Sequence, residues 1–493
     1  MAISSKRRAL SPQYVSNKQL TIEGFETPFS QKLSTANRWV VLAKQIPWDE
    51  LSSIYLKNFT PKQTGRPGIS PRVAIGAIII KHMCNLDDRE TVAQISENMY
   101  MQYFLGYSSF SAVEPFDASL FVEFRKRLGD EVINQMNDKI LEISRRSDQK
   151  GNDQDPEPVT HKGKLLIDAT ACPQDIAYPT DLNLLSEGRE ISERIIDLLY
   201  DPSSDPQKPR TYRQIARKEY LKVAQKKVKH KKGLRKAIRR QLGFLKRNLK
   251  TINKLLDTYS IFPLKARDQK YVWVINTLYE QQQKMFTSNT HSIENRIVSI
   301  HQPHVRPIVR GKTTAKVEFG AKIHVSLIDG YSFLDTISWE AFSEGKHLVD
   351  YVNNYKNRFG YYPEQILADK AYCTRANRKW LKGEGIQLIA KALGRPRAED
   401  KNLVRPGERN PIEGKFGQAK TAYGMDRIKA RLQITSQAWI ASIILVLNLV
   451  KLAGQASLCL WLSYTKPIKF WLNNLIKQQN WREYQLSSFT ALG

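Results

Sequence analysis

The chain is poor in cysteine and in acidic side chains, and each shortage excludes a class of protein. Its 493 residues include four cysteines, which lie far apart and form no Cys-x-x-Cys pair. Neither a disulfide framework nor a zinc knuckle is therefore indicated, and we expect a reduced, cytoplasmic protein. Against 77 Lys+Arg there are only 48 Asp+Glu, which leaves a formal net charge of +29. Such a surplus favours a polyanionic partner, either nucleic acid or an anionic membrane surface.

The sequence also lacks a clean hydrophobic run of membrane-spanning length. No apolar segment follows the basic first residues, so no secretory signal is indicated. The apolar stretch from Trp439 to Leu462 is interrupted near its middle by Lys451 and Gln455. A spanning helix needs about 20 mostly apolar residues, and a central lysine is costly there. We interpret the stretch as a buried core helix, and we expect the positive charge to serve nucleic acid and no membrane.

The composition supports several folded domains. Hydrophobic residues make up 41% of the chain, and roughly 150 residues per domain suggests about three domains. In residues 1–150, helix starts are indicated at Ser70-Pro71, at Asp87 for a helix through Tyr103, and at Asp117. Short capped helices of this kind are typical of a helical DNA-binding domain, although other helical bundles share the pattern. A polar linker is predicted at 147–164.

A strongly basic helical insertion is predicted at 173–307. Residues 208–254 contain 19 Lys+Arg and a single acid, Glu219. Apolar residues at alternating steps of three and four predict a coiled-coil-like seam, on which a second helix near 271–285 can fold back. A solvated helix face is the alternative explanation, but one acid leaves little ion pairing, so contact with DNA phosphates is favoured. The residues that we expect to bind DNA here are Lys226, Lys227, Lys231, Lys232, Arg235 and Arg239.

The remaining segments, 164–172 and 308–463, predict an α/β domain, and 464–493 is left as a C-terminal tail. Period-two alternation from residue 317 predicts a strand that ends at a hairpin turn, Asp329-Gly330. With the insertion set aside, the predicted order is three strands, then helix, strand, helix, strand, helix. This is the order of an RNase H-like mixed sheet.

Three carboxylates are predicted to meet at one edge of this sheet. Asp168 and Asp369 are expected to end two parallel neighbouring strands, whose carboxyl ends share an edge, and Glu413 lies on the following helix. Three carboxylates can hold two divalent cations, Mg²⁺ or Mn²⁺. Such ions activate an attacking oxygen and stabilise the leaving oxygen of a phosphodiester. We therefore predict that Asp168, Asp369 and Glu413 are catalytic and bind the metal.

Each carboxylate also has a structural explanation. Aspartates are favoured at turns after strands, where they cap backbone groups. Asn410, Pro411 and Glu413 have the spacing of a helical capping box, with Asn410 as N-cap, and Glu413 can serve both roles at once. If Glu413 is only a cap, Glu408 is the next candidate for the third carboxylate.

Five segments of the sequence resemble bacterial insertion-sequence DDE transposases, and together they cover most of residues 60–450. Three of them resemble the signature blocks around the catalytic acids: LLIDATACP at Asp168, ILADKAY at Asp369 and RNPIEGKFGQAK at Glu413. GISPRVAIGAIIIKHMCNLDDRETVAQI resembles the N-terminal domain of the insertion-sequence-five-like group, and KPRTYRQIARKEYLKVAQKKVKHKKG resembles the insertion of one branch of it.

The resemblance implies a function, a partner and further site residues. It implies cleavage of double-stranded DNA at element ends and attack of the freed 3′-OH on target DNA, by at least a dimer, in the bacterial nucleoid. Around the glutamate, the family often has a Tyr-Arg-Glu-Lys signature, which implies DNA contacts for Arg409 and Lys420. The expected tyrosine falls at Pro406 and is absent. Two alternatives remain: an RNase H-like nuclease without strand transfer, and a DNA-binding protein with a vestigial active site.

Overall fold

The chain folds as two compact units. In the computed structural model, the described residues are 32–57, 68–149, 160–203, 207–309, 317–390 and 407–454. The first unit comprises Met1–Val159, Leu327–Phe333 and Ala441–Gly493, and the second comprises Thr160–Ser326 and Leu334–Ile440. Most of the predicted linker, Pro406 and the whole predicted tail at 464–493 lie outside the described residues. The predicted division of functions among the domains stays a prediction.

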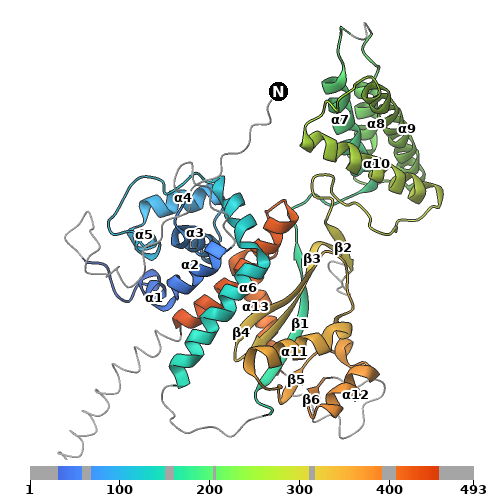
Figure 1. Cartoon of the computed structure of the whole chain (residues 1–493). Helices are drawn as coiled ribbons and strands as arrows, with labels where there is room; N and C mark the ends of the chain where they lie inside the picture. The colour runs from blue at the N-terminus through green and yellow to red at the C-terminus, as the bar shows by residue number, and fades with distance from the viewer. Residues whose placement is uncertain are drawn as a thin grey trace, which may run out of the picture. The chain divides into compact units, whose positions relative to one another are not determined.

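Before the linker, the described residues of the first unit form six helices (Figure 1). They are α1 (Arg38–Gln45), α2 (Trp48–Lys57), α3 (Pro71–Met83), α4 (Asp88–Glu97), α5 (Met99–Phe104) and α6 (Leu120–Gln149). Two of the three predicted starts are confirmed: Pro71 begins α3, and the Asp87 carboxylate accepts the Glu90 N–H at 2.8 Å. The third helix, α6, begins at Leu120, three residues after Asp117. The single helix predicted through Tyr103 is wrong, because Asn98 interrupts it with an extended backbone and caps α5 with its own side chain.

One helix among the described residues, Gln433–Gly454, is long and apolar enough to cross a membrane. Of its most apolar window, 67% is buried inside the protein. Within the first unit, the buried Asn448 amide donates to the Ser332 carbonyl at 2.7 Å and to Asn137 Oδ1 at 2.8 Å. A polar side chain satisfied by the protein in this way is typical of a core. The interpretation as a buried core helix therefore agrees with the structure up to residue 454.

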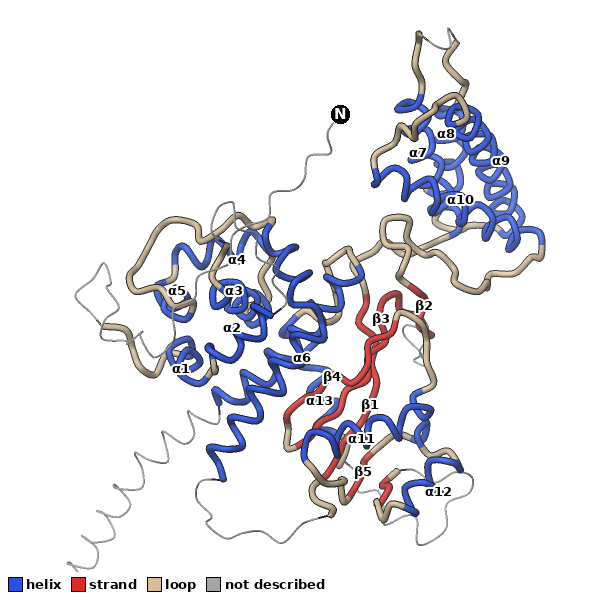
Figure 2. Tube along the Cα trace, viewed as in Figure 1, coloured by secondary structure: helices blue, strands red, loops and turns tan. Residues whose placement is uncertain are grey.

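The second unit is built on a mixed six-stranded sheet (Figure 2). Its strands are β1 (Lys164–Pro173), β2 (Arg306–Val309), β3 (Val317–Ile328), β4 (Tyr331–Ser338), β5 (Gln365–Leu367) and β6 (Gln387–Ile389). The order is β2-β3-β1-β5-β6, and β4 also pairs with β3. β1, β5 and β6 run parallel, with Leu166 opposite Leu367. The predicted parallel neighbours are thus confirmed, and the chain turns from β3 into β4 at Asp329-Gly330, where both residues have positive φ.

Helices follow the strands in the predicted order. α11 (Leu348–Phe359) precedes β5, α12 (Arg375–Gly383) precedes β6, and α13 (Asn410–Tyr423) comes after it. Two short 3₁₀ turns, η2 (Glu344–His347) and η3 (Lys370–Tyr372), lie next to the strand ends. α13 is anchored by a buried face of Ile412, Ala419 and Tyr423. These elements carry the side chains of the site described below.

The insertion is a bundle of four helices (Figure 1). They are α7 (Asp181–Leu199), α8 (Arg213–Ala224), α9 (Lys231–Leu256) and α10 (Ala266–Thr287). The predicted seam on α9 is buried, and α10 folds back on it, as expected. The packing nevertheless involves more than the two predicted helices. Leu185 and Ile196 of α7 belong to the same core as Leu245 and Leu249 of α9. The apolar face of α9 is therefore covered by α7 as well as by α10.

Candidate active site

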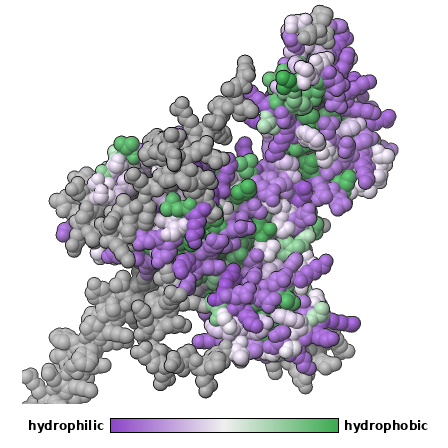
Figure 3. Space-filling view, in the orientation of Figure 1, coloured by the Kyte–Doolittle hydropathy of each residue, from purple (hydrophilic) through white to green (hydrophobic). Residues whose placement is uncertain are grey.

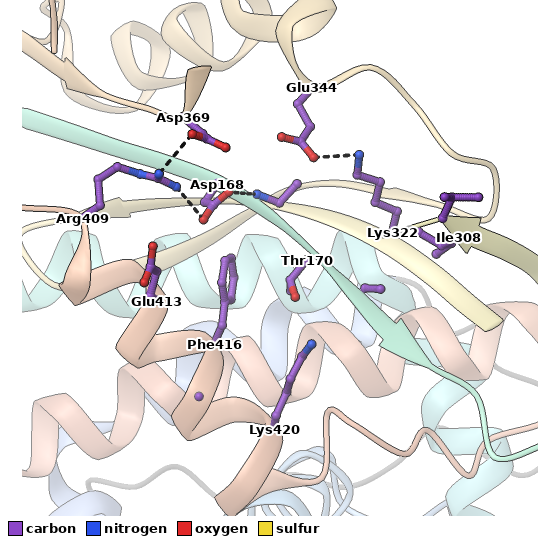
Figure 4. Close-up of a pocket in the computed structure, with 14 residues that line it drawn as sticks. Asp168, Thr170, Ile308, Lys322, Glu344, Asp369, Arg409, Glu413, Phe416 and Lys420 are labelled. Atoms are coloured by element: carbon purple, nitrogen blue, oxygen red, sulfur yellow. Dashed lines mark hydrogen bonds and ion pairs between the residues drawn. The ribbon is translucent and has the colours of Figure 1, made fainter. Parts of the chain in front are cut away.

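The three predicted carboxylates line one cavity of about 680 Å³ (Figure 4). Asp168 lies on β1, Asp369 follows β5 by two residues, and Glu413 lies in the first turn of α13. The β1–β5 register pairs Leu166 with Leu367, so the same offset places Asp168 beside Asp369. Three segments that are far apart in the sequence thus bring their acids to one place.

The expectation that Asp168 ends its strand is wrong. β1 continues to Pro173, but its pairing with β5 covers only Lys164 to Leu166. Beyond that point β1 keeps β3 as its neighbour, and this pairing extends the strand. Asp168 therefore lies where the parallel pairing stops, which still opens one side of the strand to the cavity.

Both aspartates also hold the local backbone. Asp168 Oδ1 accepts the Ala169 N–H at 2.8 Å, and Asp369 Oδ1 accepts the Lys370 N–H at 2.7 Å, which caps η3. The structural explanation of these residues is thus real, but it uses one oxygen of each carboxylate. The other oxygens remain available for further contacts.

Arg409 bridges the two aspartates. Its Nη2 donates to Asp168 Oδ2 at 2.9 Å, and its Nη1 lies 3.5 Å from Asp369 Oδ1. Figure 4 shows the guanidinium between both carboxylates. The pair of acids therefore accommodates a positive charge, which the protein itself supplies.

Burial raises the pKa of Asp168 above its ordinary value. The Ala169 N–H and the Arg409 charge oppose this rise, while the charges of Glu344 and Asp369 add to it. Ionised Asp168 is thus costly in this cavity, and further positive charge beside it lowers that cost. The electrostatics favour a site that takes up a cation.

Glu413 is not part of a capping box, so the structural explanation considered for it is wrong. α13 begins at Asn410, Arg409 is its N-cap, and no side chain caps it. The Glu413 N–H donates to the Arg409 carbonyl at 3.4 Å. The backbone carbonyl therefore already satisfies the Glu413 N–H. The Asn410 side chain cannot cap it, as a capping box would require. Glu408 is not among the residues that line the cavity, so Glu413 keeps its place as the third carboxylate.

The sequence did not single out two further charged residues of the cavity, Lys322 and Glu344. Lys322 Nζ on β3 lies 2.8 Å from Glu344 Oε1 on η2 and donates to the Phe342 carbonyl at 2.9 Å. Lys322 lies at a polar position of the period-two pattern, and this position could have indicated that its side chain faces away from the core. Glu344 begins the short 3₁₀ turn η2, and no motif marked it.

The donor chemistry of the cavity suits a hard divalent cation, because its candidate ligands are carboxylate oxygens. Within the described residues, no group of three or more His, Cys, Asp or Glu side chains is arranged closely enough to hold a metal ion. The Arg409 guanidinium instead contacts Asp168 and Asp369. A cation that binds both aspartates must therefore compete with Arg409.

The predicted DNA-binding residues of the insertion are exposed. Four of them, which we name the α8–α9 lysines, lie in the turn after α8 or in the first turn of α9: Lys226, Lys227, Lys231 and Lys232. A helix N-terminus carries a partial positive charge, so lysine side chains placed there are electrostatically unfavourable. A bound anion would offset this repulsion. Figure 3 shows mainly hydrophilic residues on the visible face of this bundle.

The other two predicted arginines differ in their surroundings. Arg239 is exposed on α9. Arg235 donates to Asn289 Oδ1 at 2.9 Å and to the Phe286 carbonyl at 3.1 Å, and its guanidinium lies over the Phe286 ring. Arg235 therefore helps to attach α9 to the end of α10. Glu219, the lone acid, pairs with Lys222 and Arg240.

Comparisons with known proteins find two regions of the chain that match family models of transposase domains. Residues 27–127 match the family model of a "Transposase domain (DUF772)", and residues 366–450 match that of a "Transposase DDE domain". The second match includes Asp369, Arg409, Glu413 and Lys420, whereas Asp168 lies outside it. Neither description names the insertion-sequence-five-like group, which stays a prediction.

One curated relative is an uncharacterised protein, ORF8 in the nfe locus of Rhizobium meliloti. It is 32% identical over 145 residues, which are 29% of this chain and 66% of that protein. The chain thus covers just under two thirds of this relative's length. No solved structure is significantly similar to the chain.

Proposed function

We propose that the chain is a DDE transposase that cuts DNA at element ends in a metal-dependent reaction and joins the freed 3′ ends to target DNA. The observation that carries this proposal is the convergence of Asp168, Asp369 and Glu413 on one cavity, in a chain that matches a transposase DDE domain. The strand order β2-β3-β1-β5-β6, with β4 also paired to β3, supports an RNase H-like catalytic domain.

The cavity residues have distinct proposed roles. Asp168, Asp369 and Glu413 would hold Mg²⁺ or Mn²⁺, up to two ions, which when bound activate the attacking oxygen and stabilise the leaving oxygen. Lys420 lies two turns after Glu413 on the same helix face and lines the cavity, so it can bind a phosphate. Arg409, once separated from the aspartates, can bind a phosphate through its planar fork of donors.

The rest of the chain would bring the DNA to this cavity. The α8–α9 lysines and Arg239 supply phosphate contacts, which add affinity without reading bases. The helical N-terminal region, 60–150, is proposed to recognise the element end. Since two ends must be joined, the active form is proposed to be a homo-oligomer on DNA.

Incubation of the purified chain with duplexes from the DNA flanking its reading frame, with Mg²⁺, tests the function. We expect cuts at terminal inverted repeats and, with target DNA, joined products; Asp369→Asn is the inactive control. Cuts without joined products would instead identify a nuclease. Binding without cuts would identify a DNA-binding protein with a vestigial site.

A further inference from the structure

One face of α13 lines the cavity with four chemically different residues. Their spacing of i, i+3, i+4 and i+7 places them along one side of the helix, while an adjacent face, formed by Ile412, Ala419 and Tyr423, is buried. In chain order they are Glu413, Phe416, Gly417 and Lys420. The helix thus presents a carboxylate, an aromatic ring, a bare backbone and an ammonium group in succession.

Phe416 is unusual in its surroundings. Among the described residues that line the cavity it is the single aromatic one, and seven of the others are charged. Its half-buried ring points into the cavity beside Glu413 and Thr170 (Figure 4). An aromatic face in a charged cavity matches a nucleotide, because every base offers a π-face for stacking while its phosphate faces the charges.

Gly417 has no explanation inside the protein. A Cβ atom built on it meets nothing within 4 Å, and its φ is not positive. Neither space nor backbone conformation therefore requires glycine, although glycine destabilises the middle of a helix relative to alanine. A glycine does, however, allow a ligand backbone to approach the helix closely.

We propose that Phe416 and Gly417 position the DNA strand in the cavity. The strand runs along α13, with the scissile phosphate beside Glu413, the Phe416 ring on the flanking base, the sugar-phosphate backbone over Gly417 and a further phosphate at Lys420. Seven residues of helix span about 10 Å, the length of about three nucleotides at roughly 3.4 Å each. The flanking base must leave its stack to meet the ring, so the DNA is locally unpaired there. This inference rests on the proposed function.

Two glycines of α13 give a matched test. Gly414 has equally open surroundings, but it does not line the cavity. Gly417→Ala and Gly414→Ala should both raise the thermal midpoint, because each improves helix propensity. Only Gly417→Ala should slow cutting of the element-end duplex, by up to about a hundredfold if it displaces the strand by about 1 Å. Equal cutting by both variants would overturn the proposed path over Gly417.

The ring is tested by binding in the presence of Mg²⁺, on duplexes whose terminal linkages are non-hydrolysable phosphonates, so that DNA can enter the cavity and no cutting occurs. The probes are element-end duplexes, each with one abasic site, moved along the terminal nucleotides. Phe416→Ala should weaken binding of the intact duplex about five- to hundredfold, the range for loss of one stacked base. At one abasic position this loss should disappear, since the base that the ring contacts is already missing. Phe416→Tyr should restore binding.

The outcomes separate this inference from the proposed function. An equal loss on every abasic duplex, or no loss at all, overturns the role of Phe416 even if the unmodified protein cuts and joins DNA. Coupling at one position supports it even if the protein never cuts, in which case the transposase proposal fails by itself.

Discussion

Replacing Arg409 with glutamine should strengthen metal binding, although it removes a side chain of the site. Arg409 is the cation that contacts both aspartates, and a metal ion that binds them must displace it. Removal of a competitor raises the affinity of whatever it competes with. Glutamine retains polarity and part of the length, but it has no charge.

The size of the effect follows from the two contacts. The bond to Asp168 is short, at 2.9 Å, and its partners are 24% and 18% exposed. A charge-assisted hydrogen bond contributes about 1.5 kcal/mol at the lower end of its range. The contact with Asp369 is longer, at 3.5 Å, with a partner that is 52% exposed, so we assign it about zero. If the metal ion no longer has to break a contact that stabilises the metal-free site by about 1.5 kcal/mol, its affinity rises about tenfold.

Titration calorimetry with Mn²⁺, in the absence of DNA, measures this directly. Arg427→Gln is the matched control, because it breaks an exposed Arg–Asp pair, with Asp175, outside the cavity; its metal affinity should equal that of the unmodified protein. Unchanged or weaker binding by Arg409→Gln would refute the competition. In that case Arg409 would orient the aspartates for the ion.

Three further predictions follow from the site and the insertion. Glu413→Gln should leave the thermal midpoint unchanged, because no capping bond is lost, while cutting falls by orders of magnitude; near-normal cutting would contradict a metal role. Asp168→Asn should stabilise the metal-free protein at neutral pH, since the raised pKa makes the ionised carboxylate costly in the fold. That gain should vanish as pH falls below the ordinary aspartate pKa, about 3.9; a gain independent of pH in thermal unfolding would contradict it. Neutralising the α8–α9 lysines should lower the slope of log affinity against log salt by up to about 3.6, at 0.9 per contact, and an unchanged slope would contradict their phosphate contacts.

The sequence predicted those parts of the fold that depend on local periodicity. Alternation from Val317 predicted β3, and Asp329-Gly330 marked the turn into β4, because few residues other than glycine and asparagine or aspartate accept positive φ there. The apolar runs before Asp168 and Asp369 predicted two buried parallel strands, and the structure pairs them in the register that brings the two acids together.

The errors arose where distant segments decide the local structure. β1 continues beyond Asp168 because it pairs with β3, about 150 residues later in the chain. The local sequence LLIDATACP gives no information about that partner. The capping-box interpretation was wrong because the Arg409 carbonyl accepts the Glu413 N–H, so no side chain is needed there. Glu344 joined the site from the short 3₁₀ turn η2, which is too short to show a periodicity.

The charges around the cavity give a reason for a metal requirement that does not depend on resemblance. The protein carries a net charge of +29, yet four acids and three bases line the cavity. Two of those bases, Arg409 and Lys322, are paired with three of the acids. The proposed phosphate contacts of the insertion would thus attract DNA from a distance, while the surplus of acids in the cavity would oppose the approach of a phosphate. Divalent cations at the acids would reverse that local sign and release Arg409 for phosphate binding. Binding of DNA to the protein and its entry into the cavity are therefore separate steps, and only the second should need metal.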